Sequence, residues 1–103
     1  MNKQLDDLRE KILPVLLPYG IKRIAVFGSL ARQEATPESD VDVLVEFEEP
    51  RRKPLGLLGW VRLERELAAQ VGRKVDLVSS TALNRYMRPS VEAEMVVLYE
   101  KTG

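Results

Sequence analysis

The spacing of apolar residues changes from helical to strand-like at Gly20. From Asn2 to about Leu17, apolar side chains recur every three or four residues, which predicts a helix. Pro14 and Pro18 fall in and just after its second half, so we expect this helix to kink or to stop early. The run from Ile24 to Phe27 is short and almost continuously apolar, which is typical of a strand buried on both faces.

The middle of the chain predicts a short helix, a strand and a loop. Residues from Ser29 to about Ala35 favour a helix that is stopped by Thr36-Pro37. The stretch DVDVLVEFE, residues 40–48, alternates polar and apolar positions and is rich in valine, which predicts a second strand. Residues 48–56 contain two prolines and opposed charges, a loop too short to link two domains.

The second half alternates helices and strands. The apolar residues of 57–71 fall within one wide arc, which predicts a helix with Gly72 as its C-cap. The remaining elements are predicted as a strand at 73–80, a helix at about 83–94 interrupted near Pro89, and a strand at 95–100. This order predicts an α/β or α+β sheet domain.

Composition narrows the chemistry that this chain is able to perform. Its 103 residues are expected to form one domain, 1–103. Sixteen basic residues balance sixteen acidic ones, so broad electrostatic binding to nucleic acid is not expected. The chain lacks cysteine and histidine, so acid–base or metal chemistry must use carboxylates. It has no membrane-length apolar run and begins with polar residues, so we expect a cytoplasmic protein.

Three aspartates fall on predicted strands. Asp40 and Asp42 project from one face of their strand, about 6–7 Å apart, while Val41 and Val43 point to the other face. Carboxylates at this separation suit oxygen ligation of a divalent cation, although Asp40 capping the strand with both side chains in water is an alternative. Asp76 interrupts a second apolar strand and needs either a partner or a place in the same cleft.

A Gly-Ser turn precedes the first two aspartates. Gly28 allows a close backbone approach, and the N–H groups after it, with the Ser29 hydroxyl, predict an anion site at a helix start. Arg32 would oppose the helix dipole there unless a phosphate lies nearby. The alternative is an ordinary N-cap with a solvated arginine. Three carboxylates beside such a turn indicate two-metal phosphoryl or nucleotidyl transfer. Glu64, inside an apolar arc, is interpreted as a rim or snorkelling residue.

Together these motifs resemble a known family. GSLAR, SDVDVLVEF and RKVDLV are similar to the minimal nucleotidyltransferases of the DNA polymerase β superfamily, and the resemblance extends from about Ile21 onward. Gln33 stands where that family commonly has glycine. The resemblance implies a mixed, mostly four-stranded sheet with helices mainly on one face. It also implies transfer of a nucleoside monophosphate from a nucleoside triphosphate, ATP in particular, to a hydroxyl.

The same resemblance implies roles for individual residues. Gly28 and Ser29 would hold the β- and γ-phosphates. The nucleotide-binding residues would be Gly28, Ser29, Arg32 and Ser39. Two Mg²⁺ ions would be held by the catalytic residues Asp40, Asp42 and Asp76, the last of which would also help to deprotonate the attacking hydroxyl.

The acceptor is expected to be a protein. So short a chain has no further helical domain to hold an acceptor, and it resembles antitoxins that adenylylate a tyrosine of a HEPN ribonuclease toxin. There are two alternatives: a non-catalytic module that silences its partner by contact alone, and a nucleotidyltransferase for a small molecule. The presence of all three aspartates favours an enzyme over the binding module. A homodimer or hetero-oligomer stays open. We expect the partner protein to dock on an exposed apolar surface at Pro54–Trp60, because Leu55 and Leu58 lie outside the apolar arc of the following helix. The alternative is that this segment folds over the sheet edge and buries both leucines.

Overall fold

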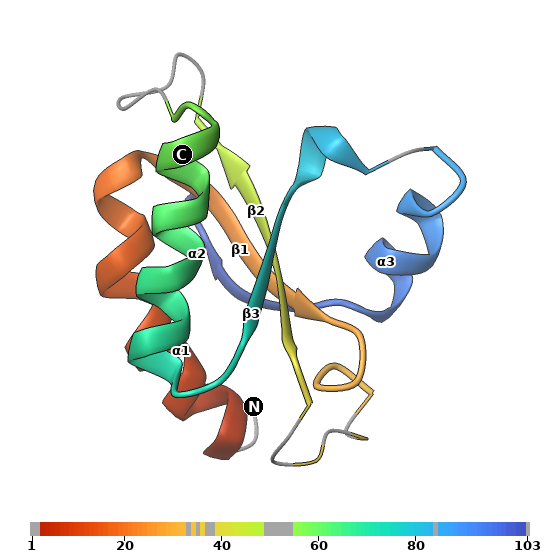
Figure 1. The fold of residues 1–103 in the computed structure, drawn as a ribbon. Helices are drawn as coiled ribbons and strands as arrows, with labels where there is room; N and C mark the ends of the chain where they lie inside the picture. The colour runs from red at the N-terminus through yellow and green to blue at the C-terminus, as the bar shows by residue number, and fades with distance from the viewer. Residues whose placement is uncertain are drawn as a thin grey trace.

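Four strands form one mixed sheet in the order β3–β2–β1–β4 (Figure 1). The computed structural model describes residues 3–32, 34, 36, 39–48, 55–83 and 85–102. The strands are β1 (Ile21–Phe27), β2 (Val41–Phe47), β3 (Val75–Ser79) and β4 (Val96–Glu100). β1 runs antiparallel to both of its neighbours, whereas β2 and β3 are parallel. The predicted mixed, four-stranded sheet is confirmed.

The helices divide unequally between the two faces of the sheet. α1 (Lys3–Leu16) and α2 (Leu57–Val71) lie together on one face, and the shorter α3 (Arg88–Glu94) lies on the other (Figure 1). Two single turns of 3₁₀ helix, at Leu17–Tyr19 and Ser80–Ala82, follow α1 and β3. Helices mainly on one face were implied by the family resemblance, and this arrangement is confirmed.

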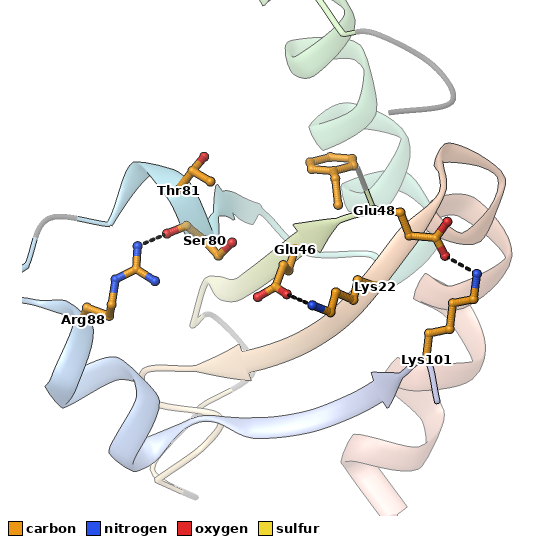
Figure 2. A pocket seen from close by; sticks show the side chains of 8 residues that line it. Lys22, Glu46, Glu48, Ser80, Thr81, Arg88 and Lys101 are labelled. Carbon is orange, nitrogen blue, oxygen red and sulfur yellow. Dashed lines mark hydrogen bonds and ion pairs between the residues drawn. The ribbon is translucent and has the colours of Figure 1, made fainter. Parts of the chain in front are cut away.

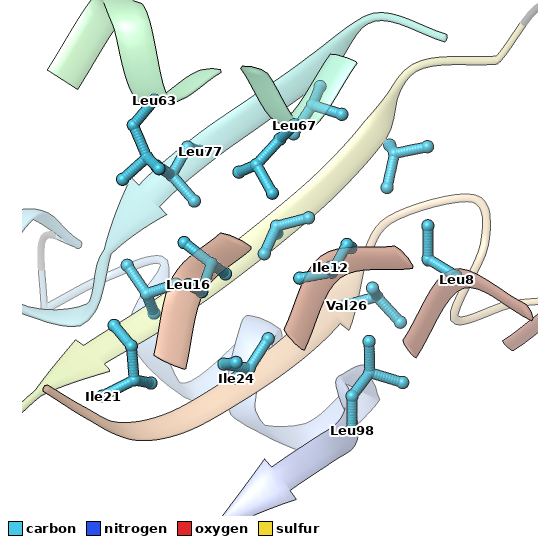
Figure 3. Packing of buried hydrophobic residues seen from close by; sticks show 14 of the residues in the cluster. Leu8, Ile12, Leu16, Ile21, Ile24, Val26, Leu63, Leu67, Leu77 and Leu98 are labelled. Carbon is cyan, nitrogen blue, oxygen red and sulfur yellow. The ribbon is translucent and has the colours of Figure 1, made fainter. Parts of the chain in front are cut away.

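The alternation of side chains along β2 determines which residues enter each layer. Val41, Val43 and Val45 are fully buried in the main core. Figure 3 shows this core, to which α1 contributes Ile12 and α2 contributes Leu67. Leu44 points the opposite way and packs with Ala25 and Val91 under α3. The polar positions of β2 therefore share the α3 side of the sheet, away from the main core.

Most predicted helix boundaries agree with the structure. α1 continues through Pro14 to Leu16, because a stripe of buried side chains at helical spacing anchors it to the sheet. α2 has the predicted bounds, and Gly72 ends it with a φ of 79°. α3 is shorter than predicted and begins at Arg88, which places Pro89 in the first turn, where proline is tolerated.

The predicted helix from Ser29 to Ala35 is wrong over its described residues. The chain instead makes consecutive turns, in which Arg32 N–H donates to the Gly28 carbonyl at 3.1 Å and Glu34 N–H to the Ser29 carbonyl at 2.8 Å. Gly28 has a φ of 73°, so the chain reverses direction there rather than starting a helix. Gln33 and Ala35 lie outside the described residues.

The expected docking leucines also need correction. Leu55 is partly buried against the main core, whereas Leu57 is 81% exposed and Leu58 is 73% exposed. Leu57 is the first residue of α2, and the buried residues of this helix, Leu63 and Leu67, come one turn or more later. Pro54 lies outside the described residues. Over the part of the chain that the structure describes, no helix has the length and apolar character to cross a membrane.

Candidate active site

The parallel pairing of β2 and β3 places two of the predicted aspartates side by side. Asp42 is the register partner of Asp76, and adjacent strands lie about 4.8 Å apart. Their chain neighbours Val43 and Leu77 are buried in the main core, so both aspartates project from the opposite, α3 side. The sequence predicted a common cleft for these carboxylates, and the strand register provides the juxtaposition.

Gly28 closes one side of this carboxylate pair. Phe27, the last residue of β1, is the register partner of Asp42, so the turn that follows passes directly beside the Asp42 side chain. A Cβ on Gly28 would overlap Asp42 Oδ2 and lie 3.3 Å from Asp42 Cγ. Together with its positive φ, this leaves glycine as the residue that fits. The backbone and the carboxylate thus line the same small space.

The electrostatics of Asp42 fit a cation site. Burial, and after it the charges of Asp76 and Asp40, raise the pKa of the Asp42 carboxyl, while Arg32 acts in the opposite direction. Among the residues that the structure describes, neither Asp42 nor Asp76 forms an ion pair. Carboxylate oxygens are the donors that Mg²⁺ prefers, so this donor set fits a divalent cation.

Asp40 is placed differently from the other two aspartates. It is exposed at the start of β2, and its Oδ2 lies 3.7 Å from Lys74 Nζ. Within the described ranges, no three acidic side chains are gathered closely enough to hold a metal ion as they stand. The structure therefore pairs Asp42 with Asp76 and leaves Asp40 beside a lysine. That all three hold metal stays a prediction.

Arg32 and Gly28 both contact a carboxylate that the sequence did not single out. Glu94, at the end of α3, accepts the Gly28 N–H at 3.2 Å and lies 3.3 Å from Arg32 Nη1. Glu34 Oε2 lies 3.2 Å from Arg32 Nε, and Glu34 and then Glu94 raise the pKa of the guanidinium. Sequence reasoning missed Glu94 because 66 positions separate it from Gly28. A negative charge at a helix C-terminus was the available signal.

The two predicted serines lie on either side of this turn and strand. The Ser29 carbonyl takes part in the turn after Gly28. Ser39 Oγ accepts the Thr36 N–H at 2.9 Å, and the Ser39 carbonyl accepts hydrogen bonds from the Arg73 guanidinium. Ser39 therefore fixes the approach of the chain to Asp40. Nucleotide binding by either serine stays a prediction.

Comparison with known proteins now decides the family. The sequence profile described as a nucleotidyltransferase domain matches residues 1–99, a span that includes the Gly28 turn and the three aspartates. The chain belongs to the nucleotidyltransferase domain family. Protein adenylyltransferase MntA of Thermococcus cleftensis is 42% identical to this nucleotidyltransferase over 90 residues, which are 87% of this chain and 80% of MntA.

Solved structures share the fold of this nucleotidyltransferase. A toxin–antitoxin complex with AMP-PNP superposes with a TM-score of 0.76 at 22% identity, covering 90% of this chain and 73% of the other. A complex of a tri-AMPylated Shewanella oneidensis HEPN toxin with an MNT antitoxin gives 0.71 at 20% identity, covering 94% and 73%. Both confirm the predicted nucleotidyltransferase fold.

Glu64 of the nucleotidyltransferase has a structural partner. Its Oε2 accepts the Leu77 N–H at 2.9 Å, on the outer side of β3. The half-buried side chain thus supplies a hydrogen bond to the edge strand, a more specific role than the predicted rim position.

A separate hollow of about 640 Å³ lies near the far end of β2 (Figure 2). Its charged side chains contact partners within the chain: Lys22 Nζ lies 3.4 Å from Glu46, and Lys101 Nζ lies 2.7 Å from Glu48. None of the predicted site residues lines it. The predicted site residues therefore lie away from this hollow.

Proposed function

We propose that this nucleotidyltransferase transfers AMP from ATP to a tyrosine hydroxyl of a HEPN-type ribonuclease toxin and thereby acts as its antitoxin. The observation that carries the proposal is the Asp42–Asp76 pair against the Gly28 turn. Similarity to MntA, named a protein adenylyltransferase, supports the reaction. The HEPN toxin in complex with an MNT antitoxin of the same fold supports the partner.

In this proposal the aspartates would bind the metal ions and the Gly28 turn would bind the nucleotide. Asp40, Asp42 and Asp76 would hold Mg²⁺, which when bound offsets phosphate charge and lowers the pKa of a coordinated hydroxyl. For this role Asp40 has to give up its ion pair with Lys74. The pair is weak, because the side chains of Lys74 and Asp40 are 71% and 45% exposed and water screens their charges.

The nucleotide would lie along the Gly28 turn. The Gly28 backbone would approach the β- and γ-phosphates, and the Ser29 hydroxyl and Arg32 guanidinium would donate to their oxygens. The acceptor hydroxyl would approach Asp76, whose carboxylate accepts its proton. The acceptor oxygen then forms its bond to the α-phosphorus as the bond to pyrophosphate breaks.

The test combines the purified protein, ATP, Mg²⁺ and a purified HEPN-type ribonuclease as the candidate partner. Intact mass of that partner reports AMP addition, and cleavage of an RNA substrate reports its ribonuclease activity. Asp42→Asn should abolish both AMP addition and silencing. Asp6→Asn, an exposed aspartate on α1, is the matched control and should retain both.

Two outcomes would contradict the proposal. If Asp42→Asn silences the ribonuclease as well as the parent does, with no AMP added, the chain acts by contact alone. If the parent adds AMP to a small molecule and not to the protein, the acceptor is wrong.

A further inference from the structure

The anion-binding groups of the Gly28 turn already contact a carboxylate of the chain itself. Glu94 Oε1 accepts the Gly28 N–H at 3.2 Å, and Arg32 Nη1 lies 3.3 Å and 3.4 Å from the two Glu94 oxygens. A carboxylate has the same sign of charge as a phosphate and accepts the same hydrogen bonds. We propose that Glu94 occupies the phosphate position in the nucleotide-free protein and that ATP must displace it. This inference rests on the proposed function.

The position of Glu94 is otherwise unfavourable. It is the last residue of α3, where the carbonyl end of a helix repels negative charge. Its charge also adds to those that disfavour the ionised form of Asp42. Arg32 and the Gly28 N–H are the contacts that offset this repulsion, and they are two of the groups proposed to bind the triphosphate.

The contact is weak enough to be exchanged. The side chains of Arg32 and Glu94 are 45% and 33% exposed, so water screens their ion pair. A triphosphate offers more negative charge and more acceptor oxygens than one carboxylate, so it should win this competition when Mg²⁺ accompanies it. Glu94 would therefore reduce nucleotide affinity without abolishing it.

The decisive measurement is calorimetric titration with AMP-PNP, with and without Mg²⁺. Glu94→Gln removes the competing charge and should tighten AMP-PNP binding by about two- to tenfold, the range of an exposed ion pair with one charged hydrogen bond. Glu92→Gln is the matched control. Glu92 lies on the same helix and is exposed, and its Oε1 lies 3.8 Å from Arg88 Nη1, so loss of its charge should leave the affinity unchanged.

A second pair of variants tests whether Glu94 lowers nucleotide affinity through its contact with Arg32. In an Arg32→Ala background, Glu94 has lost one of its two partners, so the gain from Glu94→Gln should become smaller. If Glu94→Gln melts well below Glu92→Gln, Glu94→Asp is measured in its place. The shorter side chain should reach Gly28 and Arg32 less well and give the same direction of change.

Failure of this inference differs from failure of the proposed function. If the parent binds AMP-PNP and the Glu94 variants bind it equally or more weakly, Glu94 does not compete; weaker binding would mean that it orients Arg32 toward the nucleotide. If neither the parent nor any variant binds AMP-PNP with Mg²⁺, the proposed function is overturned, and this inference with it.

Discussion

Replacement of Gly28 by alanine separates backbone strain from damage to the site. Gly28 and Gly72 have nearly equal positive φ values, 73° and 79°. A Cβ on Gly72 would meet nothing within 4 Å, whereas a Cβ on Gly28 would overlap Asp42 Oδ2. Gly72→Ala is therefore a matched control for strain alone.

The cost of strain is similar at both positions. A left-handed conformation costs an L-residue about 1–2 kcal/mol, so each variant should be less stable than the parent by about that amount. For a domain of this size, each kcal/mol lowers the melting temperature by roughly 4–8 °C. Thermal melts of the two variants should therefore lie close together and below the parent.

The effect on transfer should differ sharply between the two variants. Alanine at position 28 would overlap Asp42 Oδ2 and lie 3.3 Å from Asp42 Cγ, so the carboxylate has to leave its present position beside Asp76. A displacement of about 1 Å at a reacting centre costs roughly 100-fold in rate. AMP addition to the partner, followed by intact mass, should fall by that factor for Gly28→Ala and stay near the parental rate for Gly72→Ala.

Equal transfer rates for the two alanine variants would refute this reasoning. Asp42 would then tolerate a new position, and the close approach of the Gly28 turn would have no part in catalysis. A much larger stability loss for Gly28→Ala than for Gly72→Ala would also contradict it, since it would mean that the overlap is not relieved by rotation of the Asp42 side chain.

Three further predictions follow from other contacts. The raised pKa of Asp42 means that the folded protein holds this proton more tightly than the unfolded chain, so metal-free stability should fall as pH rises through the window above the ordinary aspartate pKa. Asp42→Asn should thus raise the free energy of unfolding of the metal-free protein, measured by denaturant titration, at pH 7 and change it little at acidic pH. An unchanged free energy of unfolding at pH 7 would contradict an unfavourable charge on Asp42. Glu64→Ala should lose about 1–3 kcal/mol in the same assay because the Leu77 N–H loses its acceptor, and an unchanged midpoint would show that water replaces it. Leu57→Glu with Leu58→Glu should weaken the partner complex in a pull-down while AMP-PNP still binds, and Ala69→Glu, exposed later on α2, is the control. Normal capture by the double variant would place the docking surface elsewhere.

The sequence predicted well wherever a periodic apolar pattern determines the structure. The bounds of α2 and the alternation of β2 follow from positions whose burial repeats every turn or every second residue. The turn after Gly28 was misjudged because local helix propensity at Ser29 competes with the sharp reversal beside Asp42. Glu94 escaped detection since its contacts with Gly28 and Arg32 depend on how α3 packs, which no local pattern reports.

The buried valines of β2 also oppose a shift in strand register that would displace Asp42. If the strand slipped by one residue, Val41, Val43 and Val45 would leave the main core for the α3 side of the sheet, and Asp42 would enter the main core. Loss of their burial costs up to roughly 1.5–3 kcal/mol for each valine, in addition to the cost of a buried charge. The repulsion between two half-buried carboxylates is too small to drive such a slip. The buried valines therefore fix the register of β2. Residues on the opposite face are able to change during evolution while their positions in the sheet stay the same.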